Sequence, residues 1–189
     1  MRAVIFDCFG VLTTDGWKQL REEFFAHDNA KMQHAIDIDK AVNAGYINYD
    51  EFIAEIVRMS GLSERDVRDR LNGSMPNKML FEYIRDELKP DYKIGMLSNA
   101  AGDWLNELFE PWQVRLFDEA VLSYQVGAVK PEPAMYQAVL ERLGVMPEES
   151  VFIDDSERYV AAAQDLGMQG IYHQDTNQTI AKLKELLHA

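Results

Sequence analysis

The 189-residue chain contains a single cysteine, Cys8, and no apolar run approaches the ~18 residues of a membrane span. One cysteine excludes an internal disulfide and a cysteine-based zinc cluster. The N-terminus has no signal-peptide pattern. Basic residues are scarce, 19 against 32 acidic ones, so the formal net charge is −13. This charge argues against a nucleic-acid or anionic-membrane partner, because nothing offsets the repulsion from phosphates. We expect a soluble, cytoplasmic protein.

Short apolar runs alternate with helical patterns along the chain. The first run, residues 3–6, stops at Asp7, and Gly10 follows soon after. An uninterrupted run of this length is typical of a strand buried on both faces, as in a parallel sheet. Strands that alternate with helices indicate βαβ units. The pattern therefore predicts an α/β fold with a mostly parallel sheet, whose strands are expected at residues 3–6, 92–97, 119–122, 150–153 and 169–172.

The block from residue 16 to residue 75 has a different pattern. Apolar side chains recur at helical spacing from Trp17 to about Gly73, with three polar or glycine-containing breaks between them. This spacing predicts about four helices, the last of them capped by Ser63. An insertion after the first strand lies over the C-terminal edge of the sheet, as a lid. We expect residues 1–15 and 76–189 to form the core and residues 16–75 a helical cap.

Polar and charged residues follow the predicted strands at corresponding places. Asp7, Ser98-Asn99 and Asp154-Asp155 each end an apolar run, and Lys130 lies in a proline-rich loop after the third strand. Each has an ordinary alternative: the aspartates, the serine and the asparagine can cap helices, and a lysine is usually solvated. In a parallel sheet, however, the C-terminal ends of the strands lie side by side, so these groups can converge on one pocket.

Such a set of groups suits phosphoryl transfer. A carboxylate at Asp7 can attack phosphorus and form an aspartyl-phosphate. Several carboxylates beside a phosphate dianion repel it unless a hard cation such as Mg²⁺ neutralises them. Ser98 can donate a hydrogen bond to the transferring group, and Lys130 can hold both the nucleophile and the phosphate in place.

The order of these motifs resembles the haloacid dehalogenase (HAD) superfamily. The matching segments are FDCFGVL, MLSN, VKPEPAMY and VFIDD, and the resemblance spans residues 2–171. It implies a Rossmann-like three-layer core, a helical cap inserted after the first strand, and Mg²⁺ at the strand ends.

The resemblance also implies the roles of single residues. Asp7 is the expected nucleophile, Ser98 with Asn99 binds the phosphate, and Lys130 is the orienting cation. The expected metal ligands are Asp7, Asp154, Asp155 and the main-chain carbonyl of Phe9.

One position departs from the phosphatases of this superfamily. They usually carry a second aspartate two residues after the nucleophile, which acts as general acid and base. Phe9 stands there and can do neither, so the hydrolysis of esters with poor leaving groups is expected to be weak. Family dehalogenases also lack that aspartate, but they use no metal, which disagrees with Asp154-Asp155. We predict a Mg²⁺-dependent phosphatase for a small phosphorylated metabolite. The alternatives are a 2-haloacid dehalogenase-type hydrolase and a catalytically weak binding protein with this fold.

Residues outside the motifs give weaker signals. Any of several cap residues can contact the substrate, and the sequence does not choose between them; they are Trp17, Arg21, His27, Lys31, His34 and Tyr46. Asp37 and Asp39 are interpreted as a solvated turn or helix start. The histidines, including His173 and His188, show no ligand spacing and are interpreted as surface or cap residues. Trp104, Trp112 and Phe117 are interpreted as core residues, with a homodimer contact as the alternative.

Overall fold

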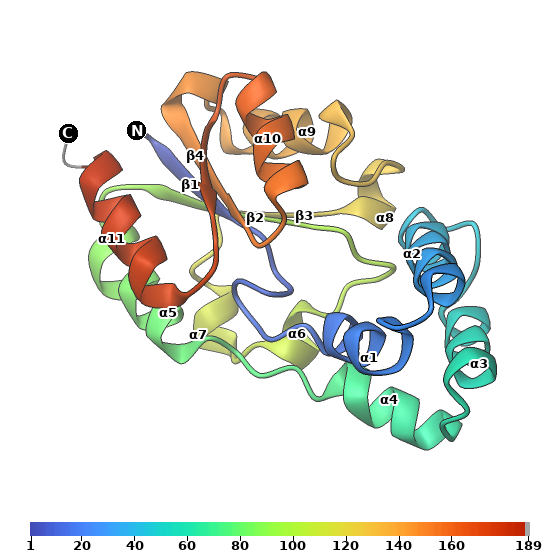
Figure 1. Ribbon diagram of the computed structural model, residues 1–189. Coiled ribbons are helices and arrows are strands. Elements are labelled where there is room, and N and C mark those ends of the chain that lie inside the picture. Colours follow the sequence, from blue (N-terminus) through green and yellow to red (C-terminus); the bar gives the residue numbers. More distant parts are fainter. Residues whose placement is uncertain (188–189) are drawn as a thin grey trace.

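The computed structural model describes residues 1–187. Its central element is a five-stranded parallel sheet (Figure 1). The strand order is β3-β2-β1-β4-β5, so β1 lies at the centre. All four residues of β1 are buried, which is why the sequence shows the strand as a pure apolar run. The strands are β1 (Ala3–Phe6), β2 (Lys93–Ser98), β3 (Glu119–Leu122), β4 (Ser150–Asp154) and β5 (Gln169–Tyr172).

Helices cover both faces of the sheet. Successive side chains of a strand point to opposite faces, so Val4 and Phe6 of β1 pack into one hydrophobic cluster while Ala3 and Ile5 pack into the other. The first cluster is covered by α5 (Lys78–Tyr83), the π-helical turn η1 (Ile84–Leu88), α6 (Leu105–Leu108), α7 (Pro111–Val114) and α11 (Thr176–Leu187). The second is covered by α9 (Pro133–Leu143) and α10 (Glu157–Asp165). The predicted three-layer α/β core is confirmed.

A helical insertion follows β1, as the sequence predicts. Residues 16–72 form α1 (Gly16–Phe25), α2 (Asn29–Asn43), α3 (Tyr49–Ser60) and α4 (Glu64–Asn72). These helices share a hydrophobic cluster of their own, with Leu20, Phe25 and Ile56 fully buried in it. The predicted cap at Ser63 is confirmed, because its Oγ accepts a hydrogen bond from the Asp66 amide at 3.1 Å.

The chain leaves the core and returns to it at adjacent points. The Thr14 amide donates to the Met75 carbonyl oxygen at 3.1 Å, and the Asn77 amide donates to the Leu12 carbonyl oxygen at 2.8 Å. These bonds tie both ends of the insertion to the turn that follows β1. The division into a core of residues 1–15 and 76–189 and a cap of residues 16–75 stays a prediction, since a separate hydrophobic cluster does not establish an independent domain.

The structure differs from the sequence expectations at a few places. A short helix, α8 (Ser123–Val126), follows β3 directly, and a 3₁₀ turn, η2 (Pro147–Glu149), precedes β4. Pro111 begins α7, as suits a residue whose missing N–H is not needed there. His188, interpreted from the sequence as a surface or cap residue, lies outside the described residues.

The interpretation of His173 as a surface or cap residue is wrong. Its amide donates to the Asp154 carbonyl oxygen at 2.9 Å, so the pairing of β5 with β4 continues one residue past the strand. This places the imidazole against α11, where Nδ1 lies 2.8 Å from Thr179 Oγ1 and the residue is buried. Burial also lowers the pKa of His173.

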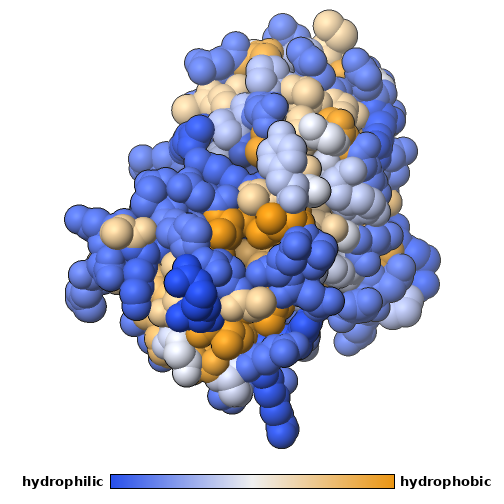
Figure 2. Space-filling view, turned by 90° about the vertical axis from the view of Figure 1, so that its right-hand side faces the viewer, coloured by the Kyte–Doolittle hydropathy of each residue, from blue (hydrophilic) through white to orange (hydrophobic). Residues whose placement is uncertain are grey.

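Hydrophilic residues cover most of the surface on the side where α2 and α3 lie, and hydrophobic residues gather near the middle of that face (Figure 2). Across residues 1–187, no helix combines the length with the apolar composition needed to cross a bilayer.

Candidate active site

Three of the predicted site residues lie at the ends of adjacent strands. Asp7 directly follows β1, Ser98 ends β2 and Asp154 ends β4, and β1 pairs with both of the other strands. The Asp7 amide donates to the Ile153 carbonyl oxygen at 2.8 Å, which fixes Asp7 beside Asp154. The parallel register therefore brings residues more than 140 positions apart to one edge of the sheet.

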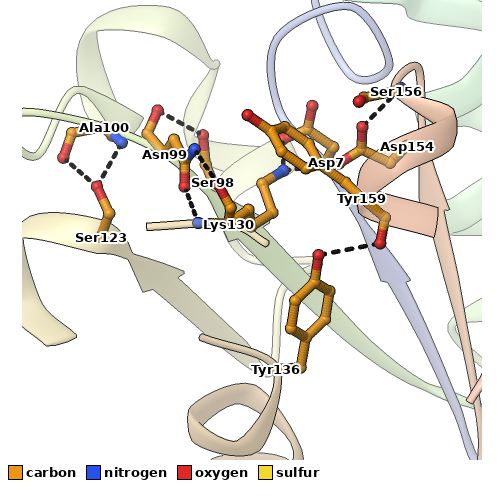
Figure 3. A network of polar contacts seen from close by, with 10 residues as sticks. All are labelled: Asp7, Ser98, Asn99, Ala100, Ser123, Lys130, Tyr136, Asp154, Ser156 and Tyr159. Carbon is orange, nitrogen blue, oxygen red and sulfur yellow. Dashed lines mark hydrogen bonds and ion pairs between the residues drawn. The ribbon is translucent and has the colours of Figure 1, made fainter. Parts of the chain in front are cut away.

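Lys130 connects two of these strand ends (Figure 3). Its Nζ donates to Asp7 Oδ1 at 2.6 Å and to Asp154 Oδ2 at 2.7 Å, and only 1% of the side chain is exposed. The ammonium also lies 5.4 Å from the ring centre of Phe152 and 5.1 Å from that of Tyr159. A charge in this position draws the two carboxylates together and fixes their orientation.

Asn99 holds the loop that carries Lys130. Its side-chain Oδ1 accepts from the Lys130 amide at 2.7 Å, and its Nδ2 donates to the Lys130 carbonyl oxygen at 3.3 Å. The neighbouring Ser98 is 1% exposed, and its Oγ lies 3.4 Å from the Asn99 carbonyl oxygen, a long contact. Asn99 thus positions Lys130, while the Ser98 hydroxyl makes only a weak internal contact.

Burial controls the electrostatics of this cluster. Burial raises the pKa of Asp7 well above its ordinary value, although the Lys130 ammonium works against the rise. The pKa of Asp154 is also raised, again chiefly by burial. For Lys130, burial acts to lower the pKa, but the Asp154 and Asp7 carboxylates outweigh it and the pKa rises. Lys130 therefore stays charged, and Asp7 and Asp154 need further positive charge nearby to ionise readily.

Asp155 completes an acidic group whose donor set suits a divalent cation. One carboxylate oxygen from each of Asp7, Asp154 and Asp155 lies within 4.8 Å of the other two. Carboxylate oxygens gathered in this way fit Mg²⁺, and the charge on the ion would favour the ionised form of Asp7. Gly10 leaves room for the group: its φ is +91°, and a Cβ there would lie 2.5 Å from Asp155 Oδ2. The proposed ligand role of the Phe9 carbonyl stays a prediction.

A cavity of about 850 Å³ opens onto this acidic edge. Asp154 lies behind the cavity wall and is fully buried. The other predicted site residues all line the cavity: Asp7, Phe9, Ser98, Asn99, Lys130 and Asp155. The structure thus gathers all of the predicted residues at one place, with Asp154 buried beside Asp7 and Lys130.

The insertion supplies much of the cavity wall. Of the cap candidates, Trp17 and Arg21 line the cavity, whereas Tyr46 is 85% exposed on the outer surface and Lys31 donates to the Met59 carbonyl oxygen within the insertion. Lys18 reaches the acidic group itself, because its Nζ lies 2.7 Å from Asp155 Oδ2.

The interpretation of Asp39 as part of a solvated turn or helix start is wrong. Asp39 lies inside α2 and faces the cavity, and burial raises its pKa to about 6 although Arg21 opposes the rise. Sequence reasoning missed this residue, and it also missed Lys18, Tyr49 and Tyr159, which line the cavity too. Nothing in their spacing marks them, because helical periodicity does not say which neighbour a face covers.

The core is α/β, helices are inserted after β1, and acidic groups gather at the strand ends. This combination indicates a hydrolase whose active site lies at this edge of the sheet. The family model described as haloacid dehalogenase-like hydrolase matches residues 1–167. The chain belongs to this family, as the motif order in the sequence predicts.

Several known proteins are similar over nearly the whole chain. A HAD family enzyme from Bacteroides thetaiotaomicron, solved in complex with magnesium and inorganic phosphate, has a TM-score of 0.69 and 26% identity, with 95% of this chain and 98% of that one covered. The Sesquiterpene phosphatase astK of Aspergillus oryzae is 25% identical over 193 residues, 98% of this chain and 96% of that protein. The Bifunctional epoxide hydrolase 2 of Sus scrofa is 25% identical over 216 residues, 98% of this chain but 39% of that protein. The chain thus spans well under half the length of this last relative.

Proposed function

We propose that this hydrolase is a Mg²⁺-dependent phosphatase that acts on phosphate monoesters through an aspartyl-phosphate at Asp7. The observation that carries the proposal is the position of Asp7: it follows the central strand, contacts Lys130 at 2.6 Å, and shares an acidic group with Asp154 and Asp155 at the floor of a cavity. The likeness to an enzyme solved with magnesium and inorganic phosphate, and to a phosphatase that the match covers almost completely, supports it.

The first step transfers the phosphoryl group to the protein. A carboxylate oxygen of Asp7 attacks phosphorus, the bond from phosphorus to the ester oxygen breaks, and the alcohol oxygen leaves with the electron pair. Lys130 holds Asp7 in line and offsets the charge of the incoming phosphate. The Ser98 hydroxyl and nearby backbone N–H groups donate hydrogen bonds to the equatorial phosphate oxygens.

The second step releases phosphate. Water attacks the phosphorus of the aspartyl-phosphate, the Asp7 carboxylate is regenerated, and one proton passes to solvent. Asp7, Asp154, Asp155 and the carbonyl of Phe9 are the residues that would hold Mg²⁺. When bound, the ion neutralises the carboxylates and the phosphate charge.

The acidic group favours this function over the dehalogenase alternative. A 2-haloacid carries its own carboxylate, and burying it beside Asp154 and Asp155 adds repulsion without a metal ion to relieve it. A phosphate dianion can bind beside the same carboxylates when Mg²⁺ is present, because both the carboxylates and the phosphate then interact with the ion. The small size of the substrate and the absence of a nucleic-acid partner stay predictions, and so does a homodimer contact.

Turnover of p-nitrophenyl phosphate with and without Mg²⁺ tests the proposal, with Asp7→Asn as the matched control. The nitrophenolate is a good leaving group, so its release does not depend on a general acid at position 9. We expect Mg²⁺-dependent release of nitrophenol that disappears in Asp7→Asn. No turnover with Mg²⁺, followed by chloride release from 2-chloropropionate, would favour the dehalogenase; failure of both reactions would favour the binding protein.

A further inference from the structure

Five aromatic side chains among the described residues form one continuous wall of the cavity. Their rings contact one another in series: Phe9 and Trp104 at 6.0 Å between centres, Trp104 and Tyr49 at 5.9 Å, Tyr49 and Phe52 at 6.1 Å, and Phe52 and Trp17 at 5.1 Å. All five line the cavity. We call these residues, Phe9, Trp17, Tyr49, Phe52 and Trp104, the aromatic wall.

The aromatic wall begins beside the nucleophile and ends in the insertion. Phe9 lies two residues after Asp7, and Trp104 directly precedes α6, so both belong to the core. Trp17 comes from α1, and Tyr49 and Phe52 come from α3. The organic group of a phosphate ester bound at Asp7 therefore contacts aromatic rings from its first atoms onward. These rings belong to both the core and the insertion.

The cavity has room for more than a phosphate. Its volume of about 850 Å³ lies in the upper part of the range of about 300–1,000 Å³ that small-molecule sites occupy. Phe52 is almost fully buried, but the other four rings keep part of their surface exposed. Aromatic faces and edges of this kind pack best on another flat ring.

The chemistry of position 9 points to the same class of ligand. Phe9 cannot protonate a departing oxygen, so the alcohol must leave as an anion or wait for a proton from water. A phenol ionises near pH 10, as tyrosine does, whereas bulk water has a far higher pKa and aliphatic alcohols behave like water. An aryl ester therefore needs no general acid. Phe9 stands where that acid would be, and its side chain provides a surface on which the aryl ring of the substrate can pack.

Given the proposed function, we propose that the substrates are aryl phosphate monoesters whose ring packs on the aromatic wall. The phosphoryl group passes to Asp7, and the bond from phosphorus to the phenolic oxygen breaks. The phenolate leaves with the electron pair and takes its proton from water.

A panel of substrates separates ring binding from leaving-group chemistry. It consists of 1-naphthyl phosphate, 2-(1-naphthyl)ethyl phosphate, octyl phosphate and glycerol 3-phosphate, with acetyl phosphate as a reference that has a good leaving group and no ring. We expect the two naphthyl compounds to share a low KM, and 1-naphthyl phosphate alone to combine it with a high kcat. Its kcat/KM should exceed that of octyl phosphate at least about tenfold, since a proton transfer is worth about 10²–10⁴ in rate.

Two wall variants show whether the rings bind ligand or only pack the insertion on the core. Trp104→Leu and Tyr49→Leu remove a ring but keep an apolar side chain, and Tyr46→Leu, at an exposed tyrosine outside the cavity, is the matched control. The readout is the ratio of kcat/KM for 1-naphthyl phosphate to that for acetyl phosphate in each protein. This ratio should fall about fivefold to tenfold in either wall variant, as expected for losing one aromatic contact, and stay constant in Tyr46→Leu.

The outcomes separate this inference from the proposed function. Acetyl phosphate turnover that requires Mg²⁺ and Asp7, with octyl or glycerol phosphate preferred over 1-naphthyl phosphate, overturns the aryl substrate and leaves the phosphatase intact. An unchanged ratio in both folded wall variants also overturns it, because the rings then serve packing alone. Loss of all turnover, acetyl phosphate included, overturns the phosphatase and the inference together.

Discussion

Lys18 Nζ lies 2.7 Å from Asp155 Oδ2, so a cap lysine forms an ion pair with one of the three carboxylates that could hold a cation. Lys18 belongs to α1, whose N-cap is Asp15, and Asp155 follows β4. The hydrogen bond that Lys18 donates to the Asp155 carboxylate raises the pKa of Lys18, so the lysine stays protonated. Its positive charge therefore offsets part of the negative potential of the three carboxylates, which would otherwise attract Mg²⁺ more strongly.

Lys18→Met should strengthen Mg²⁺ binding. The pair is partly exposed, with 42% and 18% of the two side chains accessible, so its contribution is at most about 1 kcal/mol. We expect the Kd for Mg²⁺, measured by isothermal titration calorimetry, to fall about twofold to fivefold. Lys89→Met, which breaks a surface pair with Asp118 at a similar distance, is the control. An unchanged or higher Kd in Lys18→Met would show that the two cations do not compete.

Replacement of Lys130 should cost both activity and stability. Its ammonium bonds two buried carboxylates, and Lys130→Met leaves Asp7 and Asp154 facing each other without a cation. We expect kcat with p-nitrophenyl phosphate to fall at least about 100-fold, and the free energy of unfolding to fall by about 3 kcal/mol. Lys130→Arg should not restore kcat, because the side chain is 1% exposed and a guanidinium is wider than an ammonium. A wild-type kcat in Lys130→Met would remove Lys130 from the mechanism, and a wild-type kcat in Lys130→Arg would show that a guanidinium can replace the ammonium.

Asp39 should make the stability of the protein depend on pH. Burial raises its pKa to about 6 in the folded state, while in the unfolded chain the pKa is about 3.9. Between these two pH values, Asp39 is protonated in the folded state and ionised in the unfolded chain. The contribution of Asp39 to the free energy of unfolding therefore falls as the pH rises from about 4 to about 6, and the loss is complete at higher pH.

Asp39→Asn should remove this dependence. Relative to wild type, the variant should gain about 2 kcal/mol of stability between pH 4.5 and pH 7.5, measured by urea unfolding. Asp37→Asn, at an exposed carboxylate on the same helix, is the control. If the difference between Asp39→Asn and wild type is the same at both pH values, folding does not raise the pKa of Asp39 in the way its burial indicates.

The sheet was predictable because burial on both faces leaves a direct trace in the sequence. The strands at 3–6, 119–122 and 169–172 have the predicted bounds. β2 begins and ends one residue later than predicted, at Lys93 and Ser98, and β4 extends one residue further, to Asp154. The joint order of the polar residues at the strand ends then placed the candidate site, because parallel strands align their C-terminal ends. No single motif would have done so.

The cavity wall contributed by the insertion was not predictable to the same degree. The apolar periodicity of α2 includes Val42, which the structure buries. It does not show that Asp39, next to Ile38, faces the cavity, because this depends on how the insertion sits over the core. Tyr159 is similar: its ring lies 5.1 Å from the Lys130 ammonium, a contact set by the packing of a loop against α10.

Phe9→Asp should increase activity on esters with poor leaving groups. A carboxyl at position 9 can protonate the departing oxygen, a contribution of about 10²–10⁴ in rate where geometry is good. We expect kcat with octyl phosphate to rise at least about tenfold, and kcat with 1-naphthyl phosphate to change much less, because its phenolate leaves unaided. Phe9→Asn is the matched control, since it loses the same contact with Trp104 but carries no proton to donate. Equal kcat values for the two variants on octyl phosphate would mean that position 9 does not reach the leaving oxygen, and the missing acid would then not explain any preference for aryl esters.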